Sequence, residues 1–315
     1  MERQLWIACE DGKVKEVISL LQDSQININW QESQYSRTAL HIACFYGHIE
    51  IVKLLLSDNR VDINKAANIR NQTAFSIACW EGHIEIVKLL LNDQRVDINK
   101  KNEYRETPFW IACYNGHIEI VKLLLNDQRV DINTPNSKEQ TPFYIACWNG
   151  QIEIVKLLLN DKRVDINQAN RHNRTPFYRA CYRSRIEIVK LLLASRREID
   201  INKANNDGKT VIDIARERRN IEKKEWETEE SFENKKNVVE LIESFERNQN
   251  ETRTKLRIEL GFTGKFVYFF LFIYYFNDFS SSSSFNKSIF VDIDAASLFA
   301  IIVLLSDQFL DFKHN

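Results

Sequence analysis

The sequence predicts an all-α protein built from tandem repeats that stack into a solenoid. Its six cysteines fall at positions 9, 44, 79, 113, 147 and 181, with spacings of 35 or 34 residues. A fixed period of this length is typical of stacked supersecondary units. Apolar residues recur at helical rather than alternating spacing over most of the chain, and its 315 residues include only 8 glycines and 4 prolines. Together these observations favour stacked helices.

Each repeat is expected to begin with a short helix. The stretch 107–133 matches the stretch 141–167 at nearly every position after a shift of 34, and the string returns at 38, 73 and, more loosely, 175. In this frame Thr107 caps the first helix and Pro108 occupies its first position, where a missing N–H costs nothing. Gly116 lies where the chain turns out of that helix.

A second helix follows in each repeat. Ile118, Val121, Leu124 and Leu125 fall on one face, Ile120 and Leu123 widen the stripe, and Glu119 and Lys122 are left for solvent. Residues 126–133 then extend toward the next unit. Isolated helices shorter than roughly 12 residues are marginal in water, so stacking of the apolar stripes must supply the stability.

The recurring string reads Thr-Pro-Phe-x-Ile-Ala-Cys-x-x-Gly-His-Ile-Glu-Ile-Val-Lys-Leu-Leu-Leu, followed by Asp-Ile-Asn. It resembles the ankyrin repeat, and the resemblance covers residues 2–246. The resemblance implies an ankyrin-repeat solenoid of helix–turn–helix units joined by β-hairpin fingers, with a role in protein recognition. Six units and a degenerate seventh are expected at about 2–36, 37–71, 72–105, 106–139, 140–173, 174–207 and 208–246.

Two departures from the family pattern affect the turns. The finger glycine two residues before the capping threonine is retained only at Gly208, and because arginine and glutamate tolerate a left-handed backbone poorly, we expect reshaped fingers at Arg105 and Glu139. The usual Gly-His pair becomes Ser184-Arg185 in the sixth unit, which makes that turn uncertain. The other replacements of the finger glycine are Ser36, Asn71 and Asn173.

The two ends of the repeat array differ from its middle. The first unit lacks the Thr-Pro start and carries charged residues, as an amino-terminal cap facing water should. The seventh unit contains a densely charged insertion at about 216–236, which we interpret as a solvated helical extension rather than a binding arm.

A carboxy-terminal tail over residues 247–315 is expected to be short and helical. Its apolar runs at 266–276 and 295–305 have eleven residues each, whereas a spanning helix needs about 20. The Phe/Tyr/Ser-rich segment 266–290 has low complexity and is hypothesised to be translated intron or the result of a gene-model error. Two roles stay open for the tail: it caps the stack, or it touches a membrane.

The composition argues against several kinds of chemistry. Lys+Arg 43 against Asp+Glu 44 provides no basic excess for binding nucleic acid. One cysteine per repeat is a ladder of small buried residues, and the histidines at 48, 83 and 117 also recur once per repeat without a partner at ligand spacing. We therefore expect no cofactor, no metal and no catalytic site, and because the first residues contain no apolar run, a cytoplasmic or nuclear location.

A column of aromatic residues is the candidate site. One large aromatic residue follows each Ala-Cys pair, and the family resemblance places this position on the first helix, on the concave face of the stack. The members are Phe45, Trp80, Tyr114, Trp148 and Tyr182, with Tyr46 beside the first of them. Finger residues would form a polar rim: Tyr35, Arg70, Tyr104, Lys138 and His172.

Two interpretations of the column remain. Contiguous exposed aromatic residues usually mark an interaction site, which is the interpretation we favour. Alternatively the rings stack on one another across units and stiffen the array. Trp110, Tyr144 and Tyr178 lie four residues earlier on the same side and are expected nearer the core.

These patterns predict a non-enzymatic scaffold or adaptor, monomeric, that binds another protein whose identity the sequence does not reveal. Two alternatives are retained. The chain is a membrane-tethered ankyrin arm held by its apolar tail, or it is the targeting subunit of a separate enzyme.

Overall fold

The structure is a computed structural model that describes residues 1–67, 70–220 and 228–262. Its compact units are Met1–Arg253 and Thr254–Asn315, and each is considered by itself. Of the second unit only residues 254–262 are described, and they include the end of helix α15 (Gln249–Glu259). The low-complexity segment 266–290 and both apolar runs of the tail lie outside the described residues.

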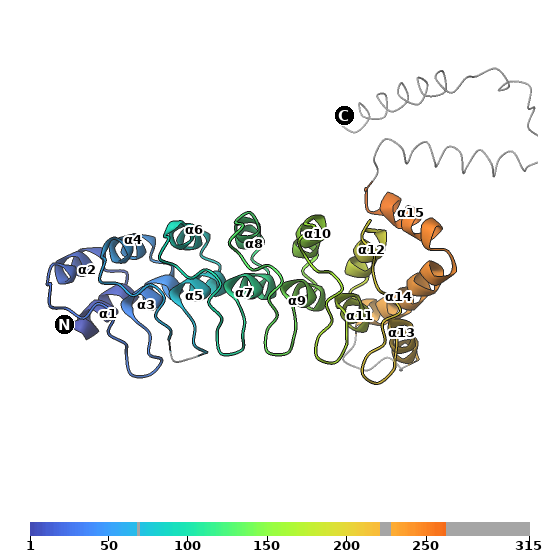
Figure 1. Cartoon of the computed structure of the whole chain (residues 1–315), viewed down its shortest axis with the longest axis horizontal. Helices are drawn as coiled ribbons and strands as arrows, with labels where there is room; N and C mark the ends of the chain where they lie inside the picture. Colours follow the sequence, from blue (N-terminus) through green and yellow to red (C-terminus); the bar gives the residue numbers. More distant parts are fainter. Residues whose placement is uncertain (68–69, 221–227, 263–315) are drawn as a thin grey trace, which may run out of the picture. The chain divides into compact units, whose positions relative to one another are not determined.

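The first unit contains pairs of antiparallel helices that follow one another along the chain (Figure 1). The first helices of the pairs lie side by side in one row, and each contacts the next. They are α1 (Glu2–Glu10), α3 (Ala39–Tyr46), α5 (Ala74–Glu81), α7 (Pro108–Asn115), α9 (Pro142–Asn149), α11 (Pro176–Tyr182) and α13 (Val211–Arg219).

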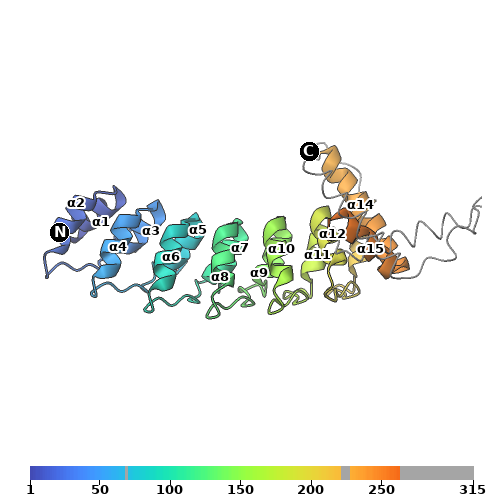
Figure 2. The same cartoon turned by 90° about the horizontal axis from the view of Figure 1, so that it is seen from above.

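The second helices form a parallel row on one side of the first (Figure 1). Seen from above in Figure 2, successive pairs from α1 to α11 step along a single direction. The second helices are α2 (Val14–Leu21), α4 (Ile49–Ser57), α6 (Ile84–Asn92), α8 (Ile118–Leu125), α10 (Ile152–Asn160), α12 (Ile186–Ala194) and α14 (Glu229–Arg247). The all-helical repeat stack expected from the sequence is present in the described residues.

Local sequence signals fix both ends of each first helix. The Thr107 hydroxyl accepts the backbone N–H of Trp110, and Pro108 occupies the first turn of α7, as expected. Gly116 ends the helix in the left-handed conformation with φ 82°. In the sixth unit Ser184 adopts φ 54° in place of that glycine, so the turn that the sequence left uncertain keeps its geometry.

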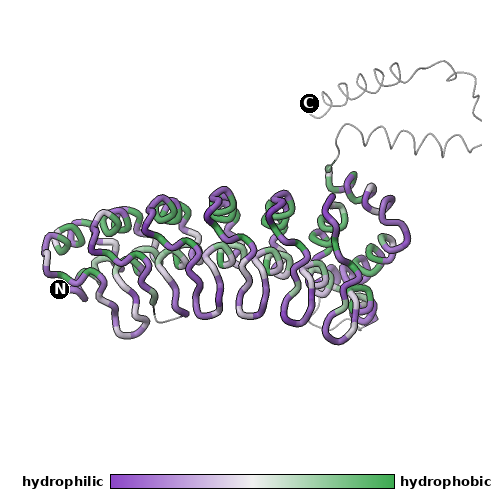
Figure 3. Tube along the Cα trace, in the orientation of Figure 1, coloured by the Kyte–Doolittle hydropathy of each residue, from purple (hydrophilic) through white to green (hydrophobic). Residues whose placement is uncertain are grey.

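The apolar stripe of each second helix faces the first helices, but its centre is shifted from the expected one. In α8 the fully buried residues are Ile120, Val121 and Leu124, whereas Ile118 and Leu125 are only half-buried. The stripe therefore centres on Ile120 and Val121. In Figure 3 hydrophobic residues follow the helices, while the loops between units are largely hydrophilic.

The fingers are hydrogen-bonded turns, and no strand is present among the residues that the structure describes. The structure therefore does not confirm the β-hairpins that the resemblance implied. Four of the described fingers close around one buried asparagine. The Asn136 Oδ1 accepts the backbone N–H groups of Lys138 (2.9 Å) and Gln140 (3.0 Å). Asn102, Asn170 and Asn205 do the same in their fingers.

The expectation of reshaped fingers at Arg105 and Glu139 was wrong. Both residues adopt the left-handed conformation, with φ 61° and 59°, like Asn71 at 55° and Gly208 at 74°. The hydrogen bonds of Asn102 and Asn136 fix the shape of the two loops, so Arg105 and Glu139 adopt a strained backbone conformation. A left-handed conformation costs an L-residue roughly 1–2 kcal/mol.

Polar bonds between units hold the array in register. The His117 Nε2 lies 2.8 Å from the carbonyl oxygen of Trp80 in the preceding unit, and His83 contacts the Phe45 carbonyl oxygen in the same way at 3.1 Å. The glycine of each turn also makes room for this ring, since a Cβ on Gly82 would lie 2.7 Å from Cε1 of His117. These contacts fix the carboxy-terminal ends of the first helices, where the aromatic column begins.

Candidate functional site

The aromatic column lies at the carboxy-terminal ends of the first helices. Its residues are half-buried or exposed, and the most exposed are Tyr46 at 49% and Tyr114 at 40%. The rings one turn earlier, Trp110, Tyr144 and Tyr178, are buried. One side of the ring system is therefore embedded in the stack, and the other remains accessible.

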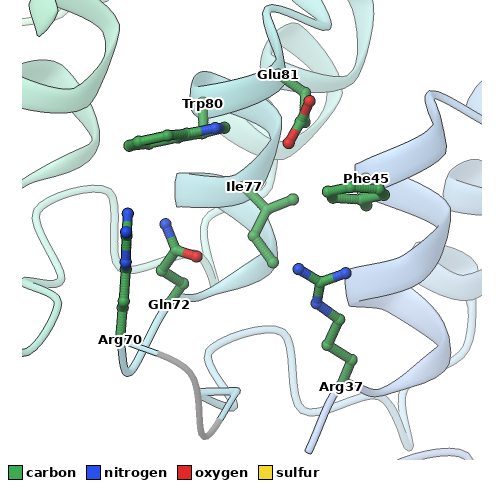
Figure 4. Close-up of a pocket in the computed structure, with 7 residues that line it drawn as sticks. All are labelled: Arg37, Phe45, Arg70, Gln72, Ile77, Trp80 and Glu81. Carbon is green, nitrogen blue, oxygen red and sulfur yellow. The ribbon is translucent and has the colours of Figure 1, made fainter. Parts of the chain in front are cut away.

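In the second and third units, finger arginines lie over the rings of the column. The guanidinium carbon of Arg37 is 4.5 Å from the Phe45 ring centroid, and that of Arg70 is 5.4 Å from the centroid of Trp80. Figure 4 shows both arginines reaching up to their rings. They border a hollow of about 200 Å³ lined by Arg37, Phe45, Arg70, Gln72, Ile77, Trp80 and Glu81. This volume is below the range of about 300–1,000 Å³ for small-molecule sites and suits a single side chain.

Ring-to-ring stacking accounts for only one junction of the column. The Trp80 and Tyr114 rings lie 6.1 Å apart at 22°, and Tyr114 also stacks on the buried Trp110 at 5.4 Å. No other pair of column rings from adjacent units makes a ring contact in the part of the chain that the structure describes. The stiffening interpretation therefore applies to the third and fourth units and not to the whole column.

At the other end of the column an arginine replaces ring stacking. The guanidinium carbon of Arg179 lies 3.7 Å from the Trp148 ring centroid and 4.9 Å from that of Tyr182. The sequence interpretation missed this residue. A signal was present, because Arg179 occupies the repeat position that holds isoleucine at 42, 77, 111 and 145.

The expected rim residues lie on the fingers, but they are not equivalent. Tyr35 and Tyr104 are exposed, and Arg37 and Arg70 lie over their rings at 5.4 and 5.8 Å. Lys138 and His172 are exposed at the tips of later fingers. From the second finger onward each tip is tied to the next by one backbone bond, such as the Ser137 N–H to the Tyr104 carbonyl oxygen at 2.7 Å. The fingers thus hold the rim as a connected edge.

A model of the family described as "Ankyrin repeats (3 copies)" matches residues 5–102 and 75–170, and a model described as "Ankyrin repeats (many copies)" matches residues 161–215. The first model alone covers more than half of the chain. The chain belongs to the ankyrin-repeat family. A search of curated proteins found no match. Ankyrin repeats are generally protein–protein interaction modules, and the resemblance seen in the sequence is confirmed.

Several titratable groups are buried inside the ankyrin stack. All six cysteines are buried and unpaired, and burial raises the pKa of the Cys9 thiol to about 12 and raises those of the other five thiols too. Burial also lowers the pKa of His41 to about 4. Within the described residues no group of three or more His, Cys, Asp or Glu side chains could hold a metal ion. Nor does any described helix have the length and apolar character needed to cross a membrane.

Proposed function

We propose that this ankyrin-repeat protein is a non-catalytic scaffold or adaptor, and that its aromatic column and finger rim bind a partner protein. The proposal rests on one observation: five aromatic side chains from five consecutive units form an accessible row flanked by arginines. Tyr, Trp and Arg are the residue types that dominate interface hot spots, and monomeric proteins rarely leave contiguous apolar patches exposed without a use.

The geometry favours recognition of an extended or helical protein segment over a small ligand. The column repeats with each unit and is not gathered into one deep cavity, and the hollow beside Trp80 accepts about one side chain. A partner would therefore place successive side chains against successive units. A targeting subunit of a separate enzyme would use the same face, so that alternative falls within the proposal.

The compartment and the oligomeric state belong to the same proposal. Buried, unpaired cysteines are usual in reducing compartments, so we place the protein in the cytoplasm or the nucleus. We also propose that it acts as a monomer that presents the column to a different protein. A membrane-tethered arm would depend on the apolar tail segments, which lie outside the described residues.

The test replaces two exposed rings at once. In a Trp80→Ala and Trp148→Ala double variant, binding of the partner isolated with the full chain should weaken by more than about 2 kcal/mol, as expected for hot spots. The melting temperature should fall by only several degrees, because each half-buried ring contributes about 0.5–1.5 kcal/mol through an aromatic pair. Titration calorimetry and thermal denaturation provide the two readouts.

A matched control removes apolar surface elsewhere. Ile18 and Ile152 are exposed on the second helices α2 and α10, so Ile18→Ala and Ile152→Ala together should leave affinity unchanged. A double tryptophan variant that melts much lower yet binds as before would mean that the column reinforces the core and that the binding face lies elsewhere.

A further inference from the structure

An unusual concentration of arginine lies where the fifth ankyrin unit meets the sixth. The stretch 171–185 contains arginine at 171, 174, 179, 183 and 185, and one of these occupies a position that other units fill with a buried isoleucine. Arg218 is contributed from α13 of the next unit. We call Arg174, Arg179, Arg183 and Arg218 the arginine cluster.

Three guanidinium groups of the cluster share two rings of the aromatic column. Besides its 3.7 Å contact with Trp148, Arg179 reaches the Tyr182 ring at 4.9 Å. Arg183 lies 5.5 Å from the Trp148 centroid, and Arg218 lies 4.6 Å from that of Tyr182. Such contacts between a cation and an aromatic face hold the guanidinium groups in place before any ligand arrives.

The charge of the cluster is not neutralised by the described residues. Arg174 lies 3.7 Å from the Asp207 carboxylate, but Arg179, Arg183 and Arg218 have no acidic side chain within 4.0 Å in the described part of the chain. The Nε atoms of Arg174, Arg179 and Arg218 are buried and have no hydrogen-bond partner among the residues that the structure describes. Burial, together with the neighbouring arginines, lowers the pKa of Arg179.

This arrangement is costly for folding. An isoleucine at position 179 would match the residues buried at the same position in the preceding units, whereas a half-buried arginine loses hydration without gaining an ion pair. When a group of opposite charge docks at such an accessible edge, its attraction to the unpaired positive charges offsets this cost.

We propose that the arginine cluster binds a carboxylate side chain of an acidic segment in the partner protein. This inference rests on the proposed function and adds the chemistry of the partner. A carboxylate is planar and presents two oxygens to the forked donors of a guanidinium, so it can lie edge-on beside the Trp148 and Tyr182 rings. Within the described residues the cluster has one acidic neighbour, Asp207, and that neighbour also presents a carboxylate.

The experiment uses a phage-displayed library of random peptides selected against the full chain. Enriched peptides should contain Asp or Glu beside an apolar or aromatic residue. One enriched peptide is then synthesised, and its affinity is measured by fluorescence anisotropy. Arg179→Ile should weaken binding of this peptide about tenfold or more. Replacing the acidic residue of the peptide by the corresponding amide should weaken binding equally. The two changes together should weaken binding little more than either change alone. Rising salt should weaken binding to the unaltered protein more than to the variant.

Two further measurements keep the result interpretable. Arg179→Ile should melt at a higher temperature than the unaltered protein, so a loss of binding cannot come from unfolding. Arg196→Ala removes an exposed arginine of the same unit that follows α12 and lies outside the cluster, and it should change affinity less than about twofold.

The outcomes separate this inference from the proposed function. If enriched peptides lose binding with Trp80→Ala but lack acidic residues or ignore Arg179→Ile, the face binds protein and the carboxylate assignment is wrong. If neither Trp80→Ala nor Arg179→Ile alters binding, both proposals fail. A peptide that requires a phosphorylated residue, and does not bind with glutamate in its place, also overturns the carboxylate assignment.

Discussion

His41 is buried at the start of α3, where its ring completes the helix cap. Its Nδ1 lies 2.7 Å from the Thr38 hydroxyl oxygen, and its Nε2 lies 3.1 Å from the Gln72 carbonyl oxygen in the next finger. The carbonyl can only accept, so Nε2 carries the proton, and Nδ1 accepts the backbone N–H of Thr38 at 3.2 Å, which makes the ring neutral. In the fourth unit Trp110 makes the equivalent bond, its Nε1 donating to the Gln140 carbonyl oxygen at 2.9 Å.

The burial of His41 makes stability depend on pH. Its pKa falls from 6.5 to about 4 on folding, so the unfolded chain takes up a proton first as the pH drops. The free energy of unfolding should therefore decrease between pH 6.5 and about 4, by at most about 3 kcal/mol, and level off below that range. Urea denaturation at several pH values measures it.

The control is His41→Ser, which introduces the residue that the third unit has at Ser76. This variant should be less stable at neutral pH because it leaves a cavity, but its stability should vary less between pH 6.5 and 4. An equal dependence on pH in both proteins would assign the effect to other groups.

Glu139 holds a left-handed backbone conformation that glycine adopts without strain. Glu139→Gly should stabilise the protein by about 0.5–1 kcal/mol, since relief of roughly 1–2 kcal/mol of strain exceeds the added entropy of glycine in the unfolded chain. Thermal denaturation checks this. Lys138→Gly, one residue earlier with no positive φ, should instead lower stability, and stabilisation by both substitutions would contradict the strain argument.

At the scale of one element, the finger around Asn136 depends on that buried side chain. Asn136→Ala would leave the backbone N–H groups of Lys138 and Gln140 without their acceptor. We expect a loss of about 2 kcal/mol or more in the free energy of unfolding, because each buried unpaired donor costs roughly 1–3 kcal/mol. Ser137→Ala at the exposed tip of the same finger should cost less than about 0.5 kcal/mol. Equal effects would mean that the tip, not the asparagine, shapes the finger.

The helices were predictable because their signals are local. The capping threonine, the first-turn proline and the turn glycine act within a few residues, so α7 and α9 begin and end where the sequence placed them. The fingers were less predictable because their shape depends on a side-chain acceptor that replaces a β ladder. The recurrence of Asn102, Asn136, Asn170 and Asn205 at a spacing of 34 or 35 was the available signal.

At the scale of the whole stack, units are joined by a repeated set of side-chain bonds. The Asn99 Nδ2 donates to the Arg129 carbonyl oxygen at 2.7 Å, and its Oδ1 accepts the Asp131 N–H at 2.9 Å. Asn133 repeats both bonds to the following unit. Since these bonds link each unit only to its neighbour, the spacing of the aromatic column is set one unit at a time.

The period also explains which parts of the candidate site the sequence could reveal. The aromatic column recurs with the repeat, so alignment of the units found it. Arg179 breaks the repeat, and its meaning depends on the rings of Trp148 and Tyr182 and on Arg218 from another helix. Contacts of this kind cannot be read from the period, because they join side chains from three units.

The central claim is that the accessible side of the aromatic column is the surface that a partner protein covers. Hydroxyl-radical footprinting of the full chain, alone and in the purified complex, tests it most directly, because it reports the solvent access of individual side chains. We expect protection of Tyr46, Trp80, Tyr114, Trp148 and Tyr182 in the complex, with Ile18 and Ile152 on the second helices unchanged. Unchanged reactivity of the column with protection on the second helices would contradict the account.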